Sequence, residues 1–510
     1  MALKAAVEVS GPSENRKYRP PTGVERTLTW KAGRRGVRIA AQADWLVVRE
    51  HGVPVAEVFF VRYERQPRNA ARPLMFLLNG GPGAASAFLH VGTAGPQRVE
   101  FSGTGRAIAP PVRLIDNAES WLEFADLVFV DPVGTGLSRT VQESRLEQYG
   151  VDADDKARER RTKTLPDAKK GFFKVKRDID VLCDFVSAFL SKSKRWESPI
   201  YVAGESYGGF RVGKLVRALP ERGIGLTGAI MVSPAVDFLA LGGADYDILP
   251  WTNVIPTMAL VARHHGRTRG RFAGKSAEDL RSTCEAFAQE ELALTLLRGE
   301  RVAAVARART FRTAAEMTGL SEELVTRCGG RIPIELFGRE LLRDQGLICG
   351  LYDGAITGPN VFPDREGQPS PNPDPTLSGI TTAFNAGVNA MLRNVLGLST
   401  EREYVLISEE VWKNWADDRA LGYWHRQLEC ADDLRYGMAL NPALRVFIAH
   451  GWYDLVTTYF SSAQSVASLR LPESLRKQVR LANYDGGHMF YTWDRSRKAV
   501  LKDVGRLVRG

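Results

Sequence analysis

Apolar and polar side chains alternate along residues 25–64, which is the period expected of strands with one face turned toward a core. The alternation breaks at Gly36 and again at residues 52–54, and it ends in the run Ala56-Glu-Val-Phe-Phe-Val-Arg-Tyr63. Glycine and proline at such breaks are typical of turns. We therefore predict an antiparallel meander over this segment.

Further along the chain, apolar residues occur in short unbroken runs that stop at Gly, Asn, Asp or Pro. Such runs are typical of strands buried on both faces of a central sheet. A helical stripe with apolar residues at steps of three and four, from Val175 to Phe189, lies between two of them, and a strand–helix–strand order predicts a parallel crossover. These runs are residues 73–78, 127–130 and 200–203. Residues 228–232 and, much later, 444–449 are predicted to be further strands of the sheet.

Residues 236–428 have a different character, with helical segments such as 277–297 and 321–328. Ser321, followed by two glutamates, is a candidate helix N-cap, and a Pro-rich stretch over residues 362–375 predicts a loop. We interpret this region as an insertion that caps the sheet. The predicted organisation is an N-terminal tail (1–24), two parts of one α/β domain (25–235 and 429–510) and the helical cap (236–428).

The composition narrows the class of protein. No stretch approaches the ~18 apolar residues of a membrane span, and the N-terminus has no apolar region of a signal peptide. The five cysteines are scattered without metal spacing, so we expect reduced thiols, no metal site and a cytoplasmic location. The net charge of +10 raises the possibility of nucleic-acid binding, but no nucleic-acid motif accompanies it, and a solvated basic surface is the preferred interpretation.

The segment Gly204-Glu-Ser-Tyr-Gly208 is a G-x-S-x-G motif between a predicted strand and a predicted helix. In the nucleophile elbow of α/β-hydrolases this sharp turn exposes the serine hydroxyl, and the glycines permit the strained backbone. The motif alone also fits a plain tight turn. In the elbow interpretation, Ser206 is the nucleophile.

Candidate partners for Ser206 follow later in the chain. Asp454 lies just beyond a predicted strand, and His488 lies in the glycine-flanked segment Tyr484-Asp-Gly-Gly-His488. The order Ser, Asp, His is that of α/β-hydrolases, with His as general base and Asp orienting it. Asp131 and Asp485 are alternative acids, but Asp131 precedes the serine and Asp485 is very close to the histidine in sequence.

Acyl transfer also needs two backbone donors for the oxyanion. The loop Asn79-Gly-Gly-Pro-Gly83 follows a predicted buried strand, so the N–H groups of Gly81 and Tyr207 are the candidates. A phosphate-binding role for this loop is the alternative, but the loop lacks the Lys-Ser/Thr of a P-loop.

Taken together, these segments resemble the serine carboxypeptidase family over about residues 70–510. The motifs that carry the resemblance are Asn79-Gly-Gly-Pro-Gly83, Asp131-Pro-Val-Gly-Thr-Gly-Leu-Ser138, Gly204-Glu-Ser-Tyr-Gly-Gly209, Asp454 and Gly486-Gly-His-Met489. The resemblance implies an α/β-hydrolase fold with a central, mostly parallel sheet, the antiparallel meander and a largely helical insertion. It implies release of C-terminal amino acids from peptides through an acyl-enzyme on Ser206, with no cofactor.

The resemblance also implies how the substrate is recognised. In the family, the Asn of the glycine loop and the Glu before the nucleophile bind the free carboxylate of the peptide, and here these are Asn79 and Glu205. A carboxyl group donates to another carboxylate only when it is protonated, so Glu205 needs a raised pKa. The expected partner is a peptide with a free C-terminus, and neither a nucleic acid nor a membrane is expected.

This chain departs from the family pattern at several positions. Ala84-Ala-Ser86 replaces the usual Cys-Ser-Ser, Asp131-Pro132 lacks the usual intervening Gln, and Phe490-Tyr491 replaces the usual Val-Pro. Thr93 stands where the family often has a second carboxylate-binding Glu, which weakens the argument for a raised pKa at Glu205.

Two other functions fit the same residues. One is an esterase or acyltransferase that uses the same triad, and the other is a catalytically silent binding protein that keeps the fold.

Overall fold

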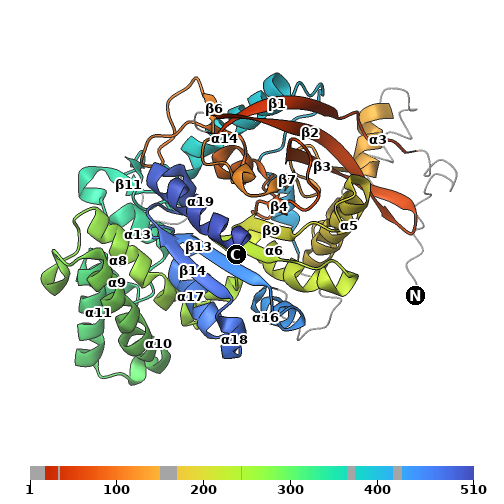
Figure 1. Cartoon of the computed structure of the whole chain (residues 1–510). Helices are drawn as coiled ribbons and strands as arrows, with labels where there is room; N and C mark the ends of the chain where they lie inside the picture. Colours follow the sequence, from red (N-terminus) through yellow and green to blue (C-terminus); the bar gives the residue numbers. More distant parts are fainter. Residues whose placement is uncertain (1–17, 33–34, 150–168, 243, 365–373, 417–427) are drawn as a thin grey trace, which may run out of the picture.

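The computed structural model describes residues 18–32, 35–149, 169–242, 244–364, 374–416 and 428–510 of the 510-residue chain (Figure 1). The predicted Pro-rich loop lies mostly outside these residues, as does most of the predicted N-terminal tail.

A ten-stranded twisted sheet runs through the molecule, and β5-β6 and β11-β12 form two separate two-stranded sheets (Figure 1). Its strand order is β1-β2-β3-β7-β4-β9-β10-β13-β14, with the short strand β8 paired to β3. The bounds are β1 Val24–Ala32, β2 Arg35–Glu50, β3 Val53–Arg65, β4 Leu74–Leu78, β7 Asp126–Val130, β8 Arg139–Thr140, β9 Ile200–Glu205, β10 Gly228–Val232, β13 Arg445–Gly451 and β14 Val479–Tyr484.

Strands β7, β4, β9, β10, β13 and β14 are parallel to one another, while β1, β2, β3 and β7 pair antiparallel in turn. The predicted antiparallel meander and the mostly parallel sheet are therefore both confirmed. Each unbroken apolar run lies on a parallel strand, because helices cover both faces of this part of the sheet.

Strand β4 illustrates this double burial. Met75 and Leu77 face one core cluster, and Phe76 and Leu78 face the other. Helices α5 (Val175–Ser193), α6 (Tyr207–Ala218) and α16 (Ala431–Leu440) pack on the second face, whereas α19 (Asp494–Arg509) packs on the first.

The chain between β10 and β13 is largely helical. Its first helices share a hydrophobic core of their own, built around side chains such as Met258, Leu280 and Phe311. These elements are η4 Phe238–Ala240, α7 Leu249–Asn253, α8 Ile255–His264, η5 Gly270–Phe272, α9 Ala277–Ala286, η6 Phe287–Leu292, α10 Ala293–Arg298, η7 Gly299–Arg301, α11 Ala304–Thr318, α12 Glu322–Arg327, α13 Ile334–Glu340 and η8 Arg343–Gln345. The Ser321 side chain accepts a hydrogen bond from Leu324 N, so the predicted N-cap of α12 is confirmed.

Later parts of the same region pack elsewhere. Helix α14 (Leu377–Ala390) and η9 (Met391–Val395) contribute Ile380, Phe384 and Met391 to the core of the sheet domain. Helix α15 (Glu409–Asn414) lies next to the glycine loop, where Ser408 N donates to Gly83 O at 2.8 Å.

The remaining elements are short or lie at the edges of the sheet. They are α2 Ala87–Leu89, η1 His90–Ala94, β5 Gln97–Val99, β6 Leu114–Asp116, η2 Trp121–Glu123, α3 Val141–Tyr149, η3 Pro220–Arg222, β11 Leu347–Cys349, β12 Thr357–Pro359, α17 Tyr459–Ala467, α18 Glu473–Arg476 and η11 Phe490–Thr492.

Candidate active site

Ser206 occupies the sharp turn between β9 and α6. Its backbone has φ 61° and ψ −124°, a conformation that costs energy for a residue with a side chain and is typical of a nucleophile elbow. The Ser206 N–H donates to Val232 O on the neighbouring strand at 2.9 Å. The side chain is half-buried, whereas the residues on either side are buried.

The two glycines of the elbow motif leave space that no other residue could leave. A Cβ on Gly204 would lie 2.1 Å from Gly208 O, and a Cβ on Gly208 would lie 2.5 Å from Leu78 O. The turn can therefore bring β9, α6 and the end of β4 into backbone contact only with glycine at both positions.

His488 and Asp454 lie on loops that follow the adjacent strands β14 and β13. His488 Nδ1 and Asp454 Oδ2 are 2.8 Å apart, and the two side chains are 3% and 0% exposed. Asp454 Oδ1 accepts hydrogen bonds from the N–H groups of Val456 and Thr457. Burial alone lowers the pKa of His488, but the carboxylates of Asp454 and Glu205 outweigh it, so the pKa lies above its ordinary value.

The segment that follows β10 contacts both loops. Ala235 N donates to Ser206 O at 3.2 Å, and the histidine loop is contacted by Ser233. Its hydroxyl donates to His488 O at 2.7 Å. Among the described residues no hydrogen bond joins Ser206 Oγ to His488 Nε2; such contacts are often long before substrate binds.

Thr457 is a site residue that the sequence analysis did not single out. Its Oγ1 lies 2.7 Å from Asp454 Oδ2, 3.0 Å from His488 Nδ1 and 2.9 Å from Ser233 O. The Thr457 hydroxyl therefore contacts Asp454 and His488 at the same time.

The region between β10 and β13 also contacts the histidine loop. His488 N donates to Tyr352 O at 2.5 Å, and Asp353 Oδ2 accepts from Gly487 N at 2.9 Å and from Trp493 Nε1 at 2.9 Å. Burial raises the pKa of Asp353 to about 7. Sequence patterns gave no signal for this contact, because Asp353 lies in no motif.

The glycine loop after β4 lies directly against the elbow. A Cβ on Gly80 would lie 2.5 Å from Tyr207 N, and Gly81 has a φ of +96°, in the left-handed region. The first N–H groups of a helix have no partner within the helix, so the Tyr207 N–H is available to a ligand at this point. Gly81 and Tyr207, the predicted oxyanion donors, thus belong to two segments in contact.

A buried ion pair holds this loop in place. Arg211 on α6 pairs with Asp178 on α5 at 2.7 Å, and its Nη1 donates to Asn79 O at 2.6 Å. The guanidinium therefore ties the start of the glycine loop to the helix that follows Ser206.

Asn79 and Glu205 meet beside the nucleophile. Asn79 Nδ2 donates to Glu205 Oε2 at 2.8 Å, and Leu89 N donates to Asn79 Oδ1, which fixes the orientation of the amide. The Tyr491 hydroxyl donates to the same Glu205 oxygen at 2.8 Å. Burial raises the pKa of Glu205 to about 7, although the hydrogen bonds and His488 oppose the rise.

The two alternative acids lie elsewhere. Asp131 accepts hydrogen bonds from Ser86 N and from the Tyr404 hydroxyl, so it fixes the glycine loop and the segment before α15. Asp485 pairs with Arg495 on α19 at 3.6 Å. Asp454 is the carboxylate in contact with His488.

The described residues contain neither a candidate metal site nor a candidate membrane-spanning helix. No cluster of three or more His, Cys, Asp or Glu in this part of the chain could hold a metal ion. Within the same residues, no helix has the length and apolar character needed to cross a bilayer.

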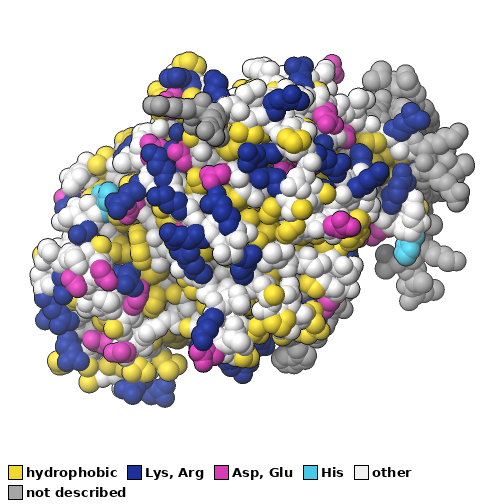
Figure 2. Space-filling model, in the orientation of Figure 1, with side chains coloured by type: hydrophobic (Ala, Val, Ile, Leu, Met, Phe, Trp, Pro, Cys, Tyr) yellow, Lys and Arg dark blue, Asp and Glu magenta, His cyan; other side chains and the backbone are white. Residues whose placement is uncertain are grey.

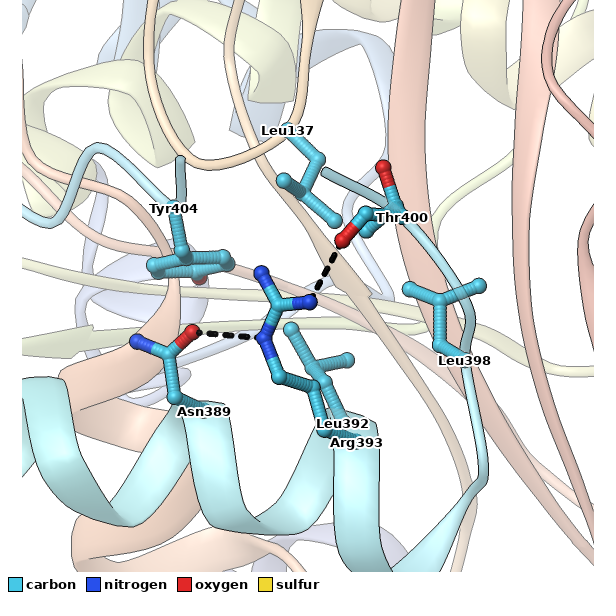
Figure 3. Close-up of a pocket in the computed structure, with 7 residues that line it drawn as sticks. All are labelled: Leu137, Asn389, Leu392, Arg393, Leu398, Thr400 and Tyr404. Atoms are coloured by element: carbon cyan, nitrogen blue, oxygen red, sulfur yellow. Dashed lines mark hydrogen bonds between the residues drawn. The ribbon is translucent and has the colours of Figure 1, made fainter. Parts of the chain in front are cut away.

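A pocket near α14 is a structural feature rather than a part of the site. Figure 3 shows the Arg393 side chain inside it, with Nε donating to Asn389 Oδ1 at 3.3 Å and Nη1 to Thr400 O at 2.5 Å. The side chain thus fastens the segment after η9. The pocket is lined by Leu137, Asn389, Leu392, Arg393, Leu398, Thr400 and Tyr404.

The parallel sheet, the elbow after β9, the aspartate after β13 and the histidine after β14 define an α/β-hydrolase fold. Residues 37–238 match the family model described as serine carboxypeptidase, which confirms the resemblance stated from the sequence over that part of the chain. The matched part contains the glycine loop and the nucleophile, while Asp454 and His488 lie beyond it.

Similar curated proteins carry the same family name. Serine carboxypeptidase S10 family member 1 of Dictyostelium discoideum is 28% identical over 203 residues, covering 38% of this chain and 40% of the relative. Serine carboxypeptidase-like 5 of Arabidopsis thaliana is 29% identical over 168 residues, covering 32% of this chain and 31% of the relative. The chain therefore matches less than half the length of these relatives.

Among solved structures, the proline iminopeptidase of Mycobacterium smegmatis covers 91% of this chain at 13% identity, with a TM-score of 0.35 and 99% of its own chain covered.

Proposed function

We propose that this protein is a serine-type carboxypeptidase, which releases C-terminal amino acids from peptides through an acyl-enzyme on Ser206. The observation that carries the proposal is the buried Glu205 carboxyl, next to the nucleophile and hydrogen-bonded to Asn79. A general hydrolase has no need of a buried acid at this position, whereas an enzyme that reads a free C-terminus does.

In the proposed mechanism, His488 takes the proton from Ser206 Oγ as the oxygen attacks the last peptide carbonyl. Asp454 orients the imidazole and stabilises the imidazolium. The N–H groups of Gly81 and Tyr207 stabilise the oxyanion, and His488 then protonates the leaving amine. Water, activated by His488, hydrolyses the acyl-enzyme and frees Ser206.

Recognition of the terminal carboxylate falls to Asn79 and Glu205. A protonated Glu205 donates to the carboxylate, and the raised pKa of about 7 keeps a substantial fraction protonated near neutral pH. The second N–H of the Asn79 amide is a further donor. Ser206 lies directly after Glu205 in sequence, so binding the terminal carboxylate brings the last peptide bond to the nucleophile.

We propose the division into a tail, a two-part α/β domain and a cap at residues 236–428, with the cap shaping the pocket for the terminal side chain. The separate core around Met258 and Phe311 supports a cap as a packing unit, although α14 belongs to the core of the sheet domain.

We also propose a cytoplasmic location. The five cysteines are free, four of them buried, as expected of a protein kept in a reducing compartment. On the face in Figure 2, Lys and Arg side chains are scattered among acidic and apolar ones, which supports a solvated basic surface rather than a nucleic-acid site.

The test compares N-blocked dipeptides with a free C-terminus, their C-terminal amides and matching esters, using the wild-type protein and Ser206→Ala. The expected result is rapid release of the terminal residue from the free acids, much slower cleavage of the amides, and loss of both in Ser206→Ala. Asp485→Asn is the control, because this carboxylate lies outside the proposed triad and its loss should leave the rates unchanged.

Other outcomes would select the alternatives. Ser206-dependent hydrolysis or transfer of esters, without cleavage of any peptide, would overturn the carboxypeptidase in favour of an esterase or acyltransferase. No reaction with any substrate, or with a serine-directed phosphonate, would indicate a silent binding protein.

A further inference from the structure

We infer that Tyr491 is a positioning residue of the carboxylate-recognition site: its hydroxyl holds one oxygen of Glu205 and leaves the other for the terminal carboxylate of the peptide. The inference deepens the proposed function and rests on it.

The hydrogen bonds at Glu205 all reach a single oxygen. The Tyr491 hydroxyl and Asn79 Nδ2 both donate to Oε2, each at 2.8 Å, and the Tyr491 side chain is 1% exposed. Oε1 accepts no hydrogen bond from the described residues. It is also not among the fully buried side-chain atoms of these residues that lack a partner, so part of its surface is accessible. The carboxyl group is therefore fixed in rotation, with Oε1 as the oxygen available to a substrate.

Tyr491 also packs against η1, the segment that contains Thr93. A Cβ on Gly92 would lie 2.8 Å from Tyr491 Cε2, so the ring packs against the backbone of η1. The Thr93 hydroxyl is buried without a hydrogen-bond partner. The short Thr93 side chain thus contributes no donor here, and the Tyr491 hydroxyl is the group that reaches Glu205.

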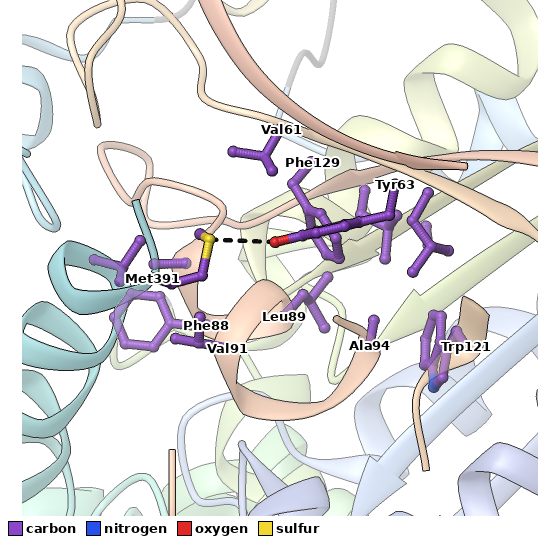
Figure 4. Packing of buried hydrophobic residues seen from close by; sticks show 14 of the residues in the cluster. Val61, Tyr63, Phe88, Leu89, Val91, Ala94, Trp121, Phe129 and Met391 are labelled. Atoms are coloured by element: carbon purple, nitrogen blue, oxygen red, sulfur yellow. Dashed lines mark hydrogen bonds between the residues drawn. The ribbon is translucent and has the colours of Figure 1, made fainter. Parts of the chain in front are cut away.

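The segment against which the Tyr491 ring packs belongs to a hydrophobic core. Figure 4 shows its residues Leu89 beside Tyr63 and Phe129, Ala94 beside Trp121, and Val91 beside Phe88. Tyr491 itself lies on η11, three residues after His488, so one short segment carries both the proposed base and the residue that orients Glu205.

A phenol acts differently here from a second carboxyl group. Burial raises the pKa of Tyr491 well above its ordinary value, so the hydroxyl keeps its proton at every working pH and always donates. A carboxyl group could share a proton with Glu205 only in acid. The recognition site of this chain therefore operates nearer neutrality.

The titration of Glu205 also depends on the groups that face it. Asp454 raises its pKa, while His488 and the hydrogen bonds from Tyr491 and Asn79 lower it. Removal of the Tyr491 hydroxyl removes one of the influences that favour the ionised form. The pKa of Glu205 is then expected to rise.

The experiment measures KM and kcat for a peptide acid, its amide and its ester from pH 5 to 9, in the wild type and in Tyr491→Phe. We expect KM for the acid to rise about tenfold, as for the loss of one hydrogen bond to an ionisable group. The kcat values, and both constants for the amide and the ester, should stay within about twofold, and the alkaline limb of the acid profile should move to higher pH.

Tyr18→Phe is the matched control, because the Tyr18 hydroxyl donates to the buried Glu57 far along the chain from the site. Equal losses on acid, amide and ester in Tyr491→Phe would mean a merely structural role and overturn the inference. A wild-type preference for the acid that Tyr491→Phe leaves intact would overturn the inference but not the proposed function. Absence of that preference in the wild type would overturn both.

A second variant tests whether the Tyr491→Phe protein is still folded. Thr93→Glu in the Tyr491→Phe background places a carboxyl group on η1, the segment against which the Tyr491 ring packs. The expected result is recovery of binding of the peptide acid at pH 5 but not at pH 8. Recovery at both pH values would contradict the assignment.

Discussion

The carboxylate of Asp353 accepts a hydrogen bond of 2.9 Å from the backbone N–H of Gly487, the residue before His488. The two residues lie 134 positions apart in the chain. A residue of the region between β10 and β13 therefore holds the loop of the proposed base. In the same region, Tyr352 O accepts a hydrogen bond from the backbone N–H of His488 itself.

Asp353→Asn should lower kcat with little change in KM. In the wild type, Oδ2 of Asp353 accepts from Gly487 N and Trp493 Nε1, and Oδ1 accepts from Ala355 N. An asparagine has only one acceptor oxygen, so one of these two sets of donors loses its partner. The histidine loop is then held less firmly. We expect a loss on the order of tenfold on acids, amides and esters alike. Steady-state kinetics on the three substrates measures it. Asp279→Asn is the control: Asp279 lies in the exposed first turn of α9, and its replacement should leave kcat and KM unchanged.

The pH profiles should differ between substrates. Glu205 loses its proton as the pH rises through about 7, so kcat/KM for peptide acids should fall above that value. Amides and esters do not need the Glu205 proton and should keep their rate. At the lower end, protonation of His488 inactivates the base; its pKa lies above the ordinary value of about 6.5, so all three substrates should lose rate below that region.

For peptide acids, kcat/KM should therefore have a narrow pH optimum between the titrations of His488 and Glu205. For esters it should reach a plateau above the titration of His488. Because Glu205 and His488 influence each other, the measured values belong to the pair. Identical pH profiles of kcat/KM for acids and esters would show that Glu205 does not take part in substrate recognition.

Gly80→Ala should disable the enzyme without unfolding it. The added Cβ would lie 2.5 Å from Tyr207 N and 2.7 Å from Glu205 O, so the glycine loop must move away from the elbow. Loss of one oxyanion donor costs on the order of 10²-fold in kcat. Gly225→Ala is the matched change, since a Cβ there meets nothing within 4 Å. An active Gly80→Ala protein would show that this loop is not part of the oxyanion site.

Arg211→Met should destabilise the fold. The change leaves Asp178 buried and unpaired and removes the donor to Asn79 O, and breaking a buried pair costs about 3–5 kcal/mol. Thermal and denaturant unfolding measure the loss. Arg312→Met is the control, because Arg312 and its partner Glu322 are both exposed and such pairs contribute little to the free energy of unfolding.

A double variant separates the charge from the shape. Arg211→Met with Asp178→Leu removes both charges, so most of the lost stability should return. A double variant as unstable as Arg211→Met alone would mean that packing, not the unpaired carboxylate, causes the effect.

Much of the fold could be predicted from sequence for a physical reason. Strands buried on both faces, such as β4 and β10, must be apolar throughout, and a polar residue marks the end of each, Asn79 after β4 and Ser233 after β10. The elbow was equally predictable, because Gly204 and Gly208 leave room that no other residue could leave. These signals are local, so one sequence is enough to see them.

The supporting residues of the site gave weaker signals. Thr457 and Asp353 act through contacts between loops whose relative positions depend on the register of β13 and β14 and on the packing of the inserted region. Tyr491 was visible only as a departure from the usual Val-Pro. Its contact with Glu205, 286 residues earlier, required the structure.

The order of the strands in the sheet has a consequence for biosynthesis. Strands β13 and β14, which carry the proposed acid and base, are the last two of the sheet to leave the ribosome, more than 200 residues after the nucleophile. A nascent chain that has folded as far as the inserted helices holds Ser206 without a proton acceptor. In the proposed mechanism, hydrolysis therefore requires that the chain has been made as far as His488, and a chain that stops at the inserted helices would not attack peptides around it.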